Sequence, residues 1–188
     1  MIAIIVPTCL ADMQGLFDMF SSLIKVTHEE YHLIFIKNEL RGFANAVNQG
    51  LEIVNRSNYE GAILLNDDIV ISTKDWMEKL IKDKDKYDII GCRPSSTDTH
   101  VAFYCTYISK KVIDTIGFLD QRFQIGECED VDYCRRAIDA GFKIGVSECE
   151  VFHRINGTIG RLNAKAQKIV QKNKQLLKEK YKGTKWEE

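Results

Sequence analysis

The sequence predicts a single α/β domain in which helices cover both faces of a mixed, mostly parallel sheet. Short apolar runs that suit buried strands alternate with helically spaced apolar residues through the first half of the chain. The resulting order, strand–helix–strand–helix–strand, implies parallel strands joined by right-handed crossovers. The chain has 188 residues and shows no internal repeat and no linker-like stretch, which indicates one domain over 1–188.

The first half of the chain carries the clearest patterns. Residues 2–6 form a β-branched run closed by Pro7, as expected of a strand buried on both faces. Residues 12–26 instead repeat apolar side chains at the spacing of an amphipathic helix. The same reasoning predicts strands at 2–6, 32–36 and 61–65, and helices at 12–26 and 41–56.

The second half is less regular. Ser109 is a candidate N-cap for a helix that begins at Lys110. Gly141 is a candidate C-cap for the helix predicted at 129–140. We expect the apolar stripe of the lysine-rich C-terminal helix to cover the core rather than to lie on a membrane. The predicted elements are strands at 89–91, 101–108 and 142–146, and helices at 76–81, from 110, at 129–140 and at 162–182.

Composition excludes several classes of protein. Lys and Arg number 26 against 27 for Asp and Glu, a net charge of −1, so no basic field indicates binding to nucleic acid. No apolar run reaches the roughly 20 residues of a transmembrane helix. The apolar N-terminus lacks the basic segment of a signal peptide, so we expect a cytoplasmic protein.

The cysteines show no metal-binding or redox motif. None of them forms a Cys-x-x-Cys pair, and none has paired histidines at zinc-finger spacing. Most lie inside apolar runs, which favours buried, reduced thiols. The six are Cys9, Cys92, Cys105, Cys128, Cys134 and Cys149.

The first candidate site is Asn66-Asp67-Asp68, at the end of the predicted strand 61–65. Ligands of open α/β sheets bind beyond the carboxyl ends of the strands. Adjacent carboxylates repel each other there, and a divalent Mg²⁺ or Mn²⁺ ion would offset that repulsion. The alternative is an ordinary solvated turn, in which Asn and Asp are common.

The second candidate is the acidic cluster over 127–132, which opens the predicted helix 129–140. Acidic residues in a first turn are favoured by the helix dipole, which is the simpler interpretation. The cluster holds more carboxylates than capping requires, so one of them is a candidate general base.

The third candidate is the segment 151–161. His153 follows a predicted core strand and is a candidate metal ligand. Arg154 and Arg161 flank a glycine-containing loop and are candidates to bind phosphate oxygens. A structural histidine beside an ordinary loop is the alternative.

Taken in order, these segments resemble the GT-A glycosyltransferases, and most closely the large family 2 of inverting enzymes. The resemblance covers residues 2–160 and implies a Rossmann-like GT-A three-layer sandwich in a trimmed form, followed by the helix at 162–182. The matching segments are Ile4–Thr8, the Gly-Phe-Ala-like stretch Arg41–Gly50, the Asp-x-Asp-like Leu64–Asp68, Gly117–Asp120 with Glu129–Arg136, Ala140–Phe142, and His153.

The resemblance also implies roles for single residues. Asp68 and His153 would bind a Mn²⁺ or Mg²⁺ ion on the diphosphate, with Asn66 and Asp67 near the ribose or the ion's waters. Asp130 would be the catalytic base, with Glu129 as the second choice.

The implied reaction is transfer of a hexose, Glc or Gal, from a UDP-sugar to an acceptor hydroxyl with inversion. The family's usual Asp-Asn-x-Ser-x-Asp stretch is missing after the second strand. Contacts to the nucleotide would therefore come from other residues, and the short acceptor side could be completed by a partner protein or a second copy. The candidate nucleotide contacts are Pro7, Thr8, Cys9, Asn38 and Arg41, besides Asn66, Asp67, Arg154 and Arg161.

Two other functions remain open. A nucleotidyltransferase would normally carry a Gly-rich, basic loop after the first strand, which residues 8–12 lack. A non-catalytic protein that binds sugar nucleotides would keep the fold without needing Asp130.

Overall fold

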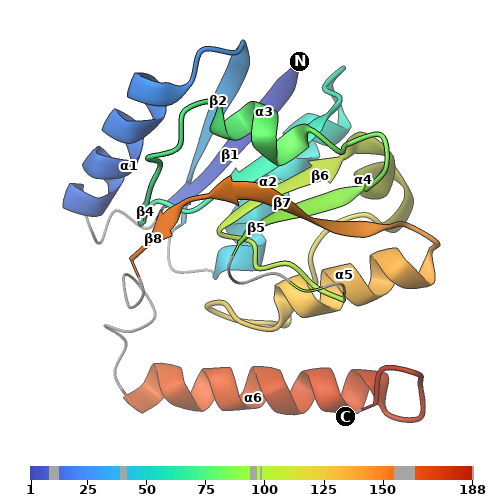
Figure 1. Cartoon of the computed structure of the whole chain (residues 1–188). Helices are drawn as coiled ribbons and strands as arrows, with labels where there is room; N and C mark the ends of the chain where they lie inside the picture. The colour runs from blue at the N-terminus through green and yellow to red at the C-terminus, as the bar shows by residue number, and fades with distance from the viewer. Residues whose placement is uncertain (9–12, 39–41, 94–96, 98, 155–163, 188) are drawn as a thin grey trace.

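A mixed six-stranded sheet forms the centre of the computed structural model, which describes residues 1–8, 13–38, 42–93, 97, 99–154 and 164–187 (Figure 1). β1 pairs in parallel with β2 and β3, whereas β6 is antiparallel to both β3 and β5. β5 pairs in parallel with β7, so the sheet is mostly parallel, as predicted. In spatial order the strands are β2 (Tyr31–Lys37), β1 (Ile2–Thr8), β3 (Gly61–Leu65), β6 (Cys105–Ser109), β5 (Ile89–Arg93) and β7 (Ile144–Glu150).

Helices cover the sheet on both faces, which confirms the three layers. Alternate side chains of β1 point to opposite faces, so Ile4 joins one core and Ile5 joins the other. The Ile4 core is closed by α1 (Met13–Val26) and α3 (Trp76–Ile81). The Ile5 core is closed by α2 (Phe43–Asn55), α4 (Lys110–Ile116) and α5 (Glu129–Asp139).

Two short strands lie outside the predicted set. β4 (Ile69–Val70) and β8 (Phe152–His153) pair with each other in a separate antiparallel ribbon. Strand β6 begins at Cys105 rather than at residue 101, because Phe103 and Tyr104 form a turn. Ser109 precedes α4, but its side chain makes no capping hydrogen bond, so the predicted hydroxyl cap is absent.

The C-terminal helix α6 (Ala164–Tyr181) lies beside α5 at the lower edge of the view in Figure 1. Of the described residues in its apolar stripe, only Tyr181 is buried, and the other buried residue of α6 is Asn173. Ile169, Leu176 and Leu177 are half-buried, so the stripe faces the protein as predicted but covers it only in part, and polar contacts add to the attachment of the helix. None of the described helices is long and apolar enough to cross a membrane.

The cysteines of the described chain are buried and free, as predicted. Cys9 lies outside the described residues.

Candidate functional site

The β4–β8 ribbon joins the two residues predicted to bind a metal. Asp68 lies in the turn after β3, and the pairing of Ile69 with His153 brings the β8 histidine beside it. His153 Nε2 lies 3.1 Å from Asp68 Oδ1, and the Arg154 amide donates to the Asp68 carbonyl at 3.0 Å. Residues far apart in the sequence thus meet near the carboxyl end of β3.

Tyr104 completes this cluster, although the sequence analysis did not select it. Its ring stacks on His153 with centroids 4.7 Å apart and planes inclined by 11°. Its backbone carbonyl accepts a hydrogen bond from the backbone N–H of Asn66 at 2.9 Å. Tyr104 lies inside an apolar run that reads as a strand, so no sequence signal separates it from a core residue.

Two buried amide oxygens near the strand ends have no hydrogen-bond partner among the described residues. They are Asn66 Oδ1, directly after β3, and Asn38 Oδ1, directly after β2. A buried acceptor without a partner costs roughly 1–3 kcal/mol, so a ligand that satisfies it is favoured. The buried Asp68 carboxylate and the His153 nitrogen are oxygen and nitrogen donors of the kind that bind Mn²⁺ or Mg²⁺, and the unpartnered Asn66 Oδ1 belongs to the residue two positions before Asp68.

The acidic pair Glu129 and Asp130 begins α5. Burial, aided by the charge of Asp130, raises the pKa of Glu129 to about 8. Burial likewise raises the pKa of Asp130, against the hydrogen bond of 2.8 Å that the Val131 amide donates to Asp130 Oδ1. Glu129 Oε2 has no partner among the described residues. The pair therefore combines a carboxyl group protonated at neutral pH with a second carboxyl group that can exchange a proton.

The loop before α5 holds a strained backbone. Ile125, Glu127 and Cys128 have φ angles of 67°, 72° and 77°, in a region that side-chain-bearing residues rarely adopt. The Asn173 side chain from α6 fastens this loop by donating to the carbonyls of Gln124, Gly126 and Glu127 at 2.9, 2.9 and 3.1 Å.

The start of α2 meets the same loop. The Phe43 amide donates to the Ile125 carbonyl at 3.1 Å. Gly42, at φ 94°, comes so close that a Cβ there would lie 3.0 Å from Ile125 N. The Gly-Phe pair singled out in the sequence therefore packs against the loop that leads to Glu129 and Asp130.

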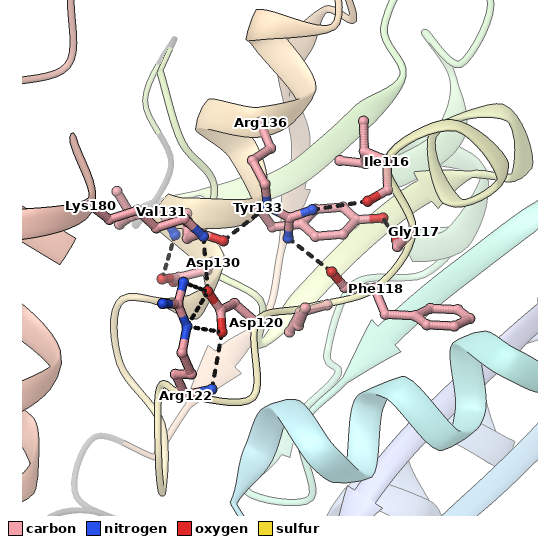
Figure 2. A network of polar contacts seen from close by, with 12 residues as sticks. Ile116, Gly117, Phe118, Asp120, Arg122, Asp130, Val131, Tyr133, Arg136 and Lys180 are labelled. Atoms are coloured by element: carbon pink, nitrogen blue, oxygen red, sulfur yellow. Dashed lines mark hydrogen bonds and ion pairs between the residues drawn. The ribbon is translucent and has the colours of Figure 1, made fainter. Parts of the chain in front are cut away.

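A network of charged side chains connects the first turns of α5 to the loop after α4 and to α6 (Figure 2). Lys180 of α6 pairs with Asp120 at 2.9 Å and with the fully buried Asp132 at 2.6 Å. Arg136 binds Asp132 at 3.0 Å and donates to the carbonyls of the preceding loop. Arg122 and Lys180 hold the pKa of Asp120 well below its usual range. The network ties α5, α6 and the loop after α4 together.

The predicted nucleotide contacts other than Asn66 lie in different parts of the structure. Thr8 and Asn38 adjoin each other, because the Asn38 amide donates to the Thr8 carbonyl at 2.6 Å, and Pro7 is buried in β1. Arg154 turns toward α1, where its guanidinium pairs with Asp18. Asp67 is half-buried in the turn beside Asp68. Cys9, Arg41 and Arg161 lie outside the described residues.

A cavity of about 580 Å³ lies between α5, α6 and the C-terminal turn, and its lining includes Cys128 and Val131, the residues on either side of the acidic pair in the sequence. His100 lines it, and the charge of this histidine acts to lower the pKa of Asp130. The Arg135 guanidinium lies over the rings of Tyr181 and Trp186, at 4.9 and 5.6 Å. The cationic side chains around the cavity are Arg135, Lys174, Lys178 and Lys185.

Several solved structures with similar folds are glycosyltransferases. At 12% identity and a TM-score of 0.64, 78% of this chain matches 55% of the mannosyltransferase PcManGT from Pyrobaculum calidifontis, solved with GDP-Man and Mn²⁺. At 13% and 0.63, 92% matches 79% of the catalytic domain of Drosophila β1,4-galactosyltransferase 7. At 11% and 0.65, 81% matches 43% of GalNAc-T7, solved with UDP, GalNAc and Mn²⁺.

No protein-family model and no curated protein sequence matches the chain. The chain spans about half the length of the mannosyltransferase and less of GalNAc-T7. At this level of identity the likeness establishes the fold. The chain therefore shares the fold of these glycosyltransferases, which is the GT-A fold that the sequence predicts.

Proposed function

We propose that this chain is a metal-dependent glycosyltransferase that moves a hexose from a UDP-sugar to an acceptor hydroxyl with inversion. The observation that carries the proposal is the Asp68–His153 pair close to the carboxyl end of β3, where Asn66 also has a buried, unpartnered side-chain oxygen. In an open α/β sheet this is the edge where ligands bind. The three similar enzymes support glycosyl transfer as the reaction class.

Asp68 and His153 would hold the Mn²⁺ or Mg²⁺ ion, with the Asn66 oxygen available to it or to one of its waters. The bound ion would neutralise the charge that grows on the departing diphosphate. The chain's own residues would orient the donor: Thr8, Asn38 and Asp67 lie at or near the same strand ends. The ring of Tyr104 fixes the orientation of the His153 imidazole.

Asp130 is our candidate for the general base. Its Oδ1 accepts the Val131 amide, which leaves Oδ2 to take the proton of the acceptor hydroxyl as that oxygen attacks the anomeric carbon. Glu129 is more deeply buried, and its raised pKa of about 8 keeps it protonated at neutral pH. It therefore suits positioning of Asp130 better than proton abstraction.

Binding tests the donor site before any acceptor is known. We expect UDP with Mn²⁺ to raise the melting temperature, because a ligand at 100-fold over its Kd stabilises the fold by about 2.7 kcal/mol. GDP, CDP and ADP complete the panel, since one of the similar enzymes was solved with GDP-Man. His153→Ala should abolish the metal-dependent part, and Phe152→Ala, at an exposed neighbour, should retain it. No metal-dependent shift with any nucleotide would contradict the proposal.

Turnover separates an enzyme from a binding protein. Hydrolysis of the UDP-sugar to UDP and free sugar, a slow side reaction of transferases, gives a readout without an acceptor. Asp130→Asn should lower the rate by about 10²–10⁴-fold and keep the metal-dependent UDP shift. Unchanged hydrolysis in this variant would exclude Asp130 as the base. If the native chain hydrolyses none of the UDP-sugars, a non-catalytic binding protein would be favoured. The anomer of the product, read by NMR, tests inversion.

The cavity beside Asp130 is our candidate entry for the acceptor. Four cationic side chains against the single lining carboxylate of Glu187 favour an acceptor that carries a phosphate or carboxylate group, although Lys174 and Lys185 also pair with Glu127 and Asp139. In a screen of anionic and neutral sugars as acceptors, we expect faster transfer to the anionic ones. Lys178→Glu should then raise the KM for the acceptor, whereas Lys172→Glu, on the same helix outside the cavity, should not.

A further inference from the structure

Three cysteines meet in the core although no spacing motif links them. Cys92, Cys105 and Cys149 lie on β5, β6 and β7, and each is completely buried. Their sulfur atoms all lie within 4.8 Å of one another. The remaining described cysteines are Cys128, which precedes α5, and Cys134, which lies within it, and both stand outside this three-thiol cluster.

The closeness of the three sulfurs exceeds what neighbouring strands impose. β5 lies between β6 and β7, and Gly91 pairs with Thr106, so Cys92 stands opposite Cys105. Strands are spaced about 4.8 Å apart, which places β6 and β7 roughly 9.6 Å from each other. The sulfurs of Cys105 and Cys149 are about half that distance apart. Both side chains therefore lean inward over Cys92.

A bulge in β7 aims Cys149 at the other two thiols. Gly91 pairs with Val146 and Arg93 with Glu150, so a two-residue step on β5 faces a four-residue step on β7. The Ser147 hydroxyl fixes this irregularity, because it donates to the Gly91 carbonyl at 3.1 Å and accepts from the Cys149 amide at 3.2 Å. Bulges commonly redirect a side chain toward a functional position.

We propose that Cys92, Cys105 and Cys149 bind one thiophilic d¹⁰ metal cation, of the class of Cu(I), Zn(II) and Cd(II). Soft thiolate ligands select these ions. Three sulfurs at about 2.3 Å from one ion lie up to roughly 4.0 Å from one another, so a small inward movement closes the site. Burial of a cysteine as a small apolar residue explains its place in the core but requires no convergence of three of them.

The site would have a structural role beside the candidate active site. Cys105 directly follows Tyr104, and β7 leads from Cys149 into β8 with His153. Tyr104 also donates its hydroxyl hydrogen to the carbonyl of Arg93, next to Cys92. An ion at the three thiols would thus tie together the strand ends that carry Tyr104 and His153.

Cd(II) is the probe for the experiment, because its thiolate complexes absorb in the ultraviolet by charge transfer. The reduced full-length chain is titrated with Cd(II) in the folded state and during refolding from denaturant, since the cluster is closed to solvent. We expect an endpoint at one equivalent, a 1:1 complex in native mass spectrometry and a higher melting temperature.

Cysteine variants decide where the ion binds. Cys92→Ala, Cys105→Ala and Cys149→Ala should each lose the absorption, whereas Cys134→Ala, at an equally buried cysteine outside the cluster, should retain it. Circular dichroism checks that each variant folds. If an alanine variant does not fold, the nearly isosteric Cys149→Ser is used in its place to remove one thiol of the cluster. Binding of Cu(I) and Zn(II) is then compared by competition with Cd(II).

Three results would overturn the proposal. They are the absence of charge-transfer absorption under both titration conditions, an unchanged endpoint in the cluster variants, and a native disulfide between two of the three cysteines, seen as a mass lower by about 2 Da. None of these readouts uses a nucleotide or a sugar, so the outcome is independent of the proposed glycosyl transfer.

Discussion

Glu129 and Asp130 are neighbours in the sequence, yet their surroundings assign them different protonation behaviour. Glu129 faces the interior with 5% of its surface exposed, and burial raises its pKa to about 8. Asp130 is half-buried; burial raises its pKa as well, but the hydrogen bond from the Val131 backbone amide opposes that rise by favouring the ionised form. The resemblance implied Asp130 as the base with Glu129 as the second choice, and the difference in burial and hydrogen bonding is consistent with that order.

The raised pKa of Glu129 predicts how stability depends on pH. Between its ordinary value of 4.5 and about 8, the folded chain binds more protons at this group than the unfolded chain does. Stability at this group therefore falls as pH rises through that window, by at most roughly 1.4 kcal/mol per pH unit. Glu129→Gln removes the effect, so its stability relative to the native chain should increase from pH 5 to pH 8.

Urea unfolding at several pH values measures this difference. Glu148→Gln changes an exposed glutamate on β7 and serves as the control. A stability difference between Glu129→Gln and the native chain that stays flat with pH would show that Glu129 is ionised in the folded chain.

Among the elements, α6 contributes to the candidate site through a single amide side chain. Asn173 donates to three carbonyls of the strained 124–127 loop and accepts the Gln124 amide at 3.3 Å. The loop in turn sets the entry of α5 and hence the position of Asp130. An element at the far end of the chain thus positions the candidate base.

Asn173→Ala should therefore lower both stability and turnover. Loss of these hydrogen bonds leaves the buried Gly126 carbonyl without the Asn173 donor. We expect this to lower the free energy of unfolding, measured in urea, by roughly 1–3 kcal/mol. We expect the turnover of UDP-sugar hydrolysis to fall while the metal-dependent UDP shift persists, because the Asp68–His153 pair lies on other elements. Gln171→Ala, at an exposed position of α6, is the control. Equal stability of the two variants would show that Asn173 does not fasten the loop.

The length of an element decides whether its residues show a recognisable pattern. The longer strands and helices were predictable because burial on one or both faces imposes a period on the residues. β4 and β8 have two residues each, too few for a period, and they form only because Ile69 and His153 meet across the fold. Pairing over such distances also creates the three-thiol cluster and the stacking of Tyr104 on His153. The candidate metal residues Asp68 and His153 could be selected from the sequence, whereas their contact with each other and with Tyr104 could not.

At the scale of the whole molecule, the sheet and α6 are stabilised by different forces. β1 and β3 are buried along their whole length, between two apolar cores. α6 instead depends on polar contacts at Asn173, Lys180 and Tyr181. Segments with few buried apolar contacts open locally at a lower free energy than the core does. We therefore expect two levels of stability within one domain.

Hydrogen exchange followed by mass spectrometry measures both levels. Amides of β1 and β3 should exchange only by global unfolding, and amides of 173–181 should exchange faster through local release of α6. Lys180→Met removes a cation from the buried Asp132 and should speed exchange in α6 with little change in β1. Because α6 lines the cavity beside Asp130, a bound anionic acceptor should slow the same amides. Equal protection of α6 and β3, or equal acceleration of both in Lys180→Met, would instead mean that the helix and the sheet unfold as one cooperative unit.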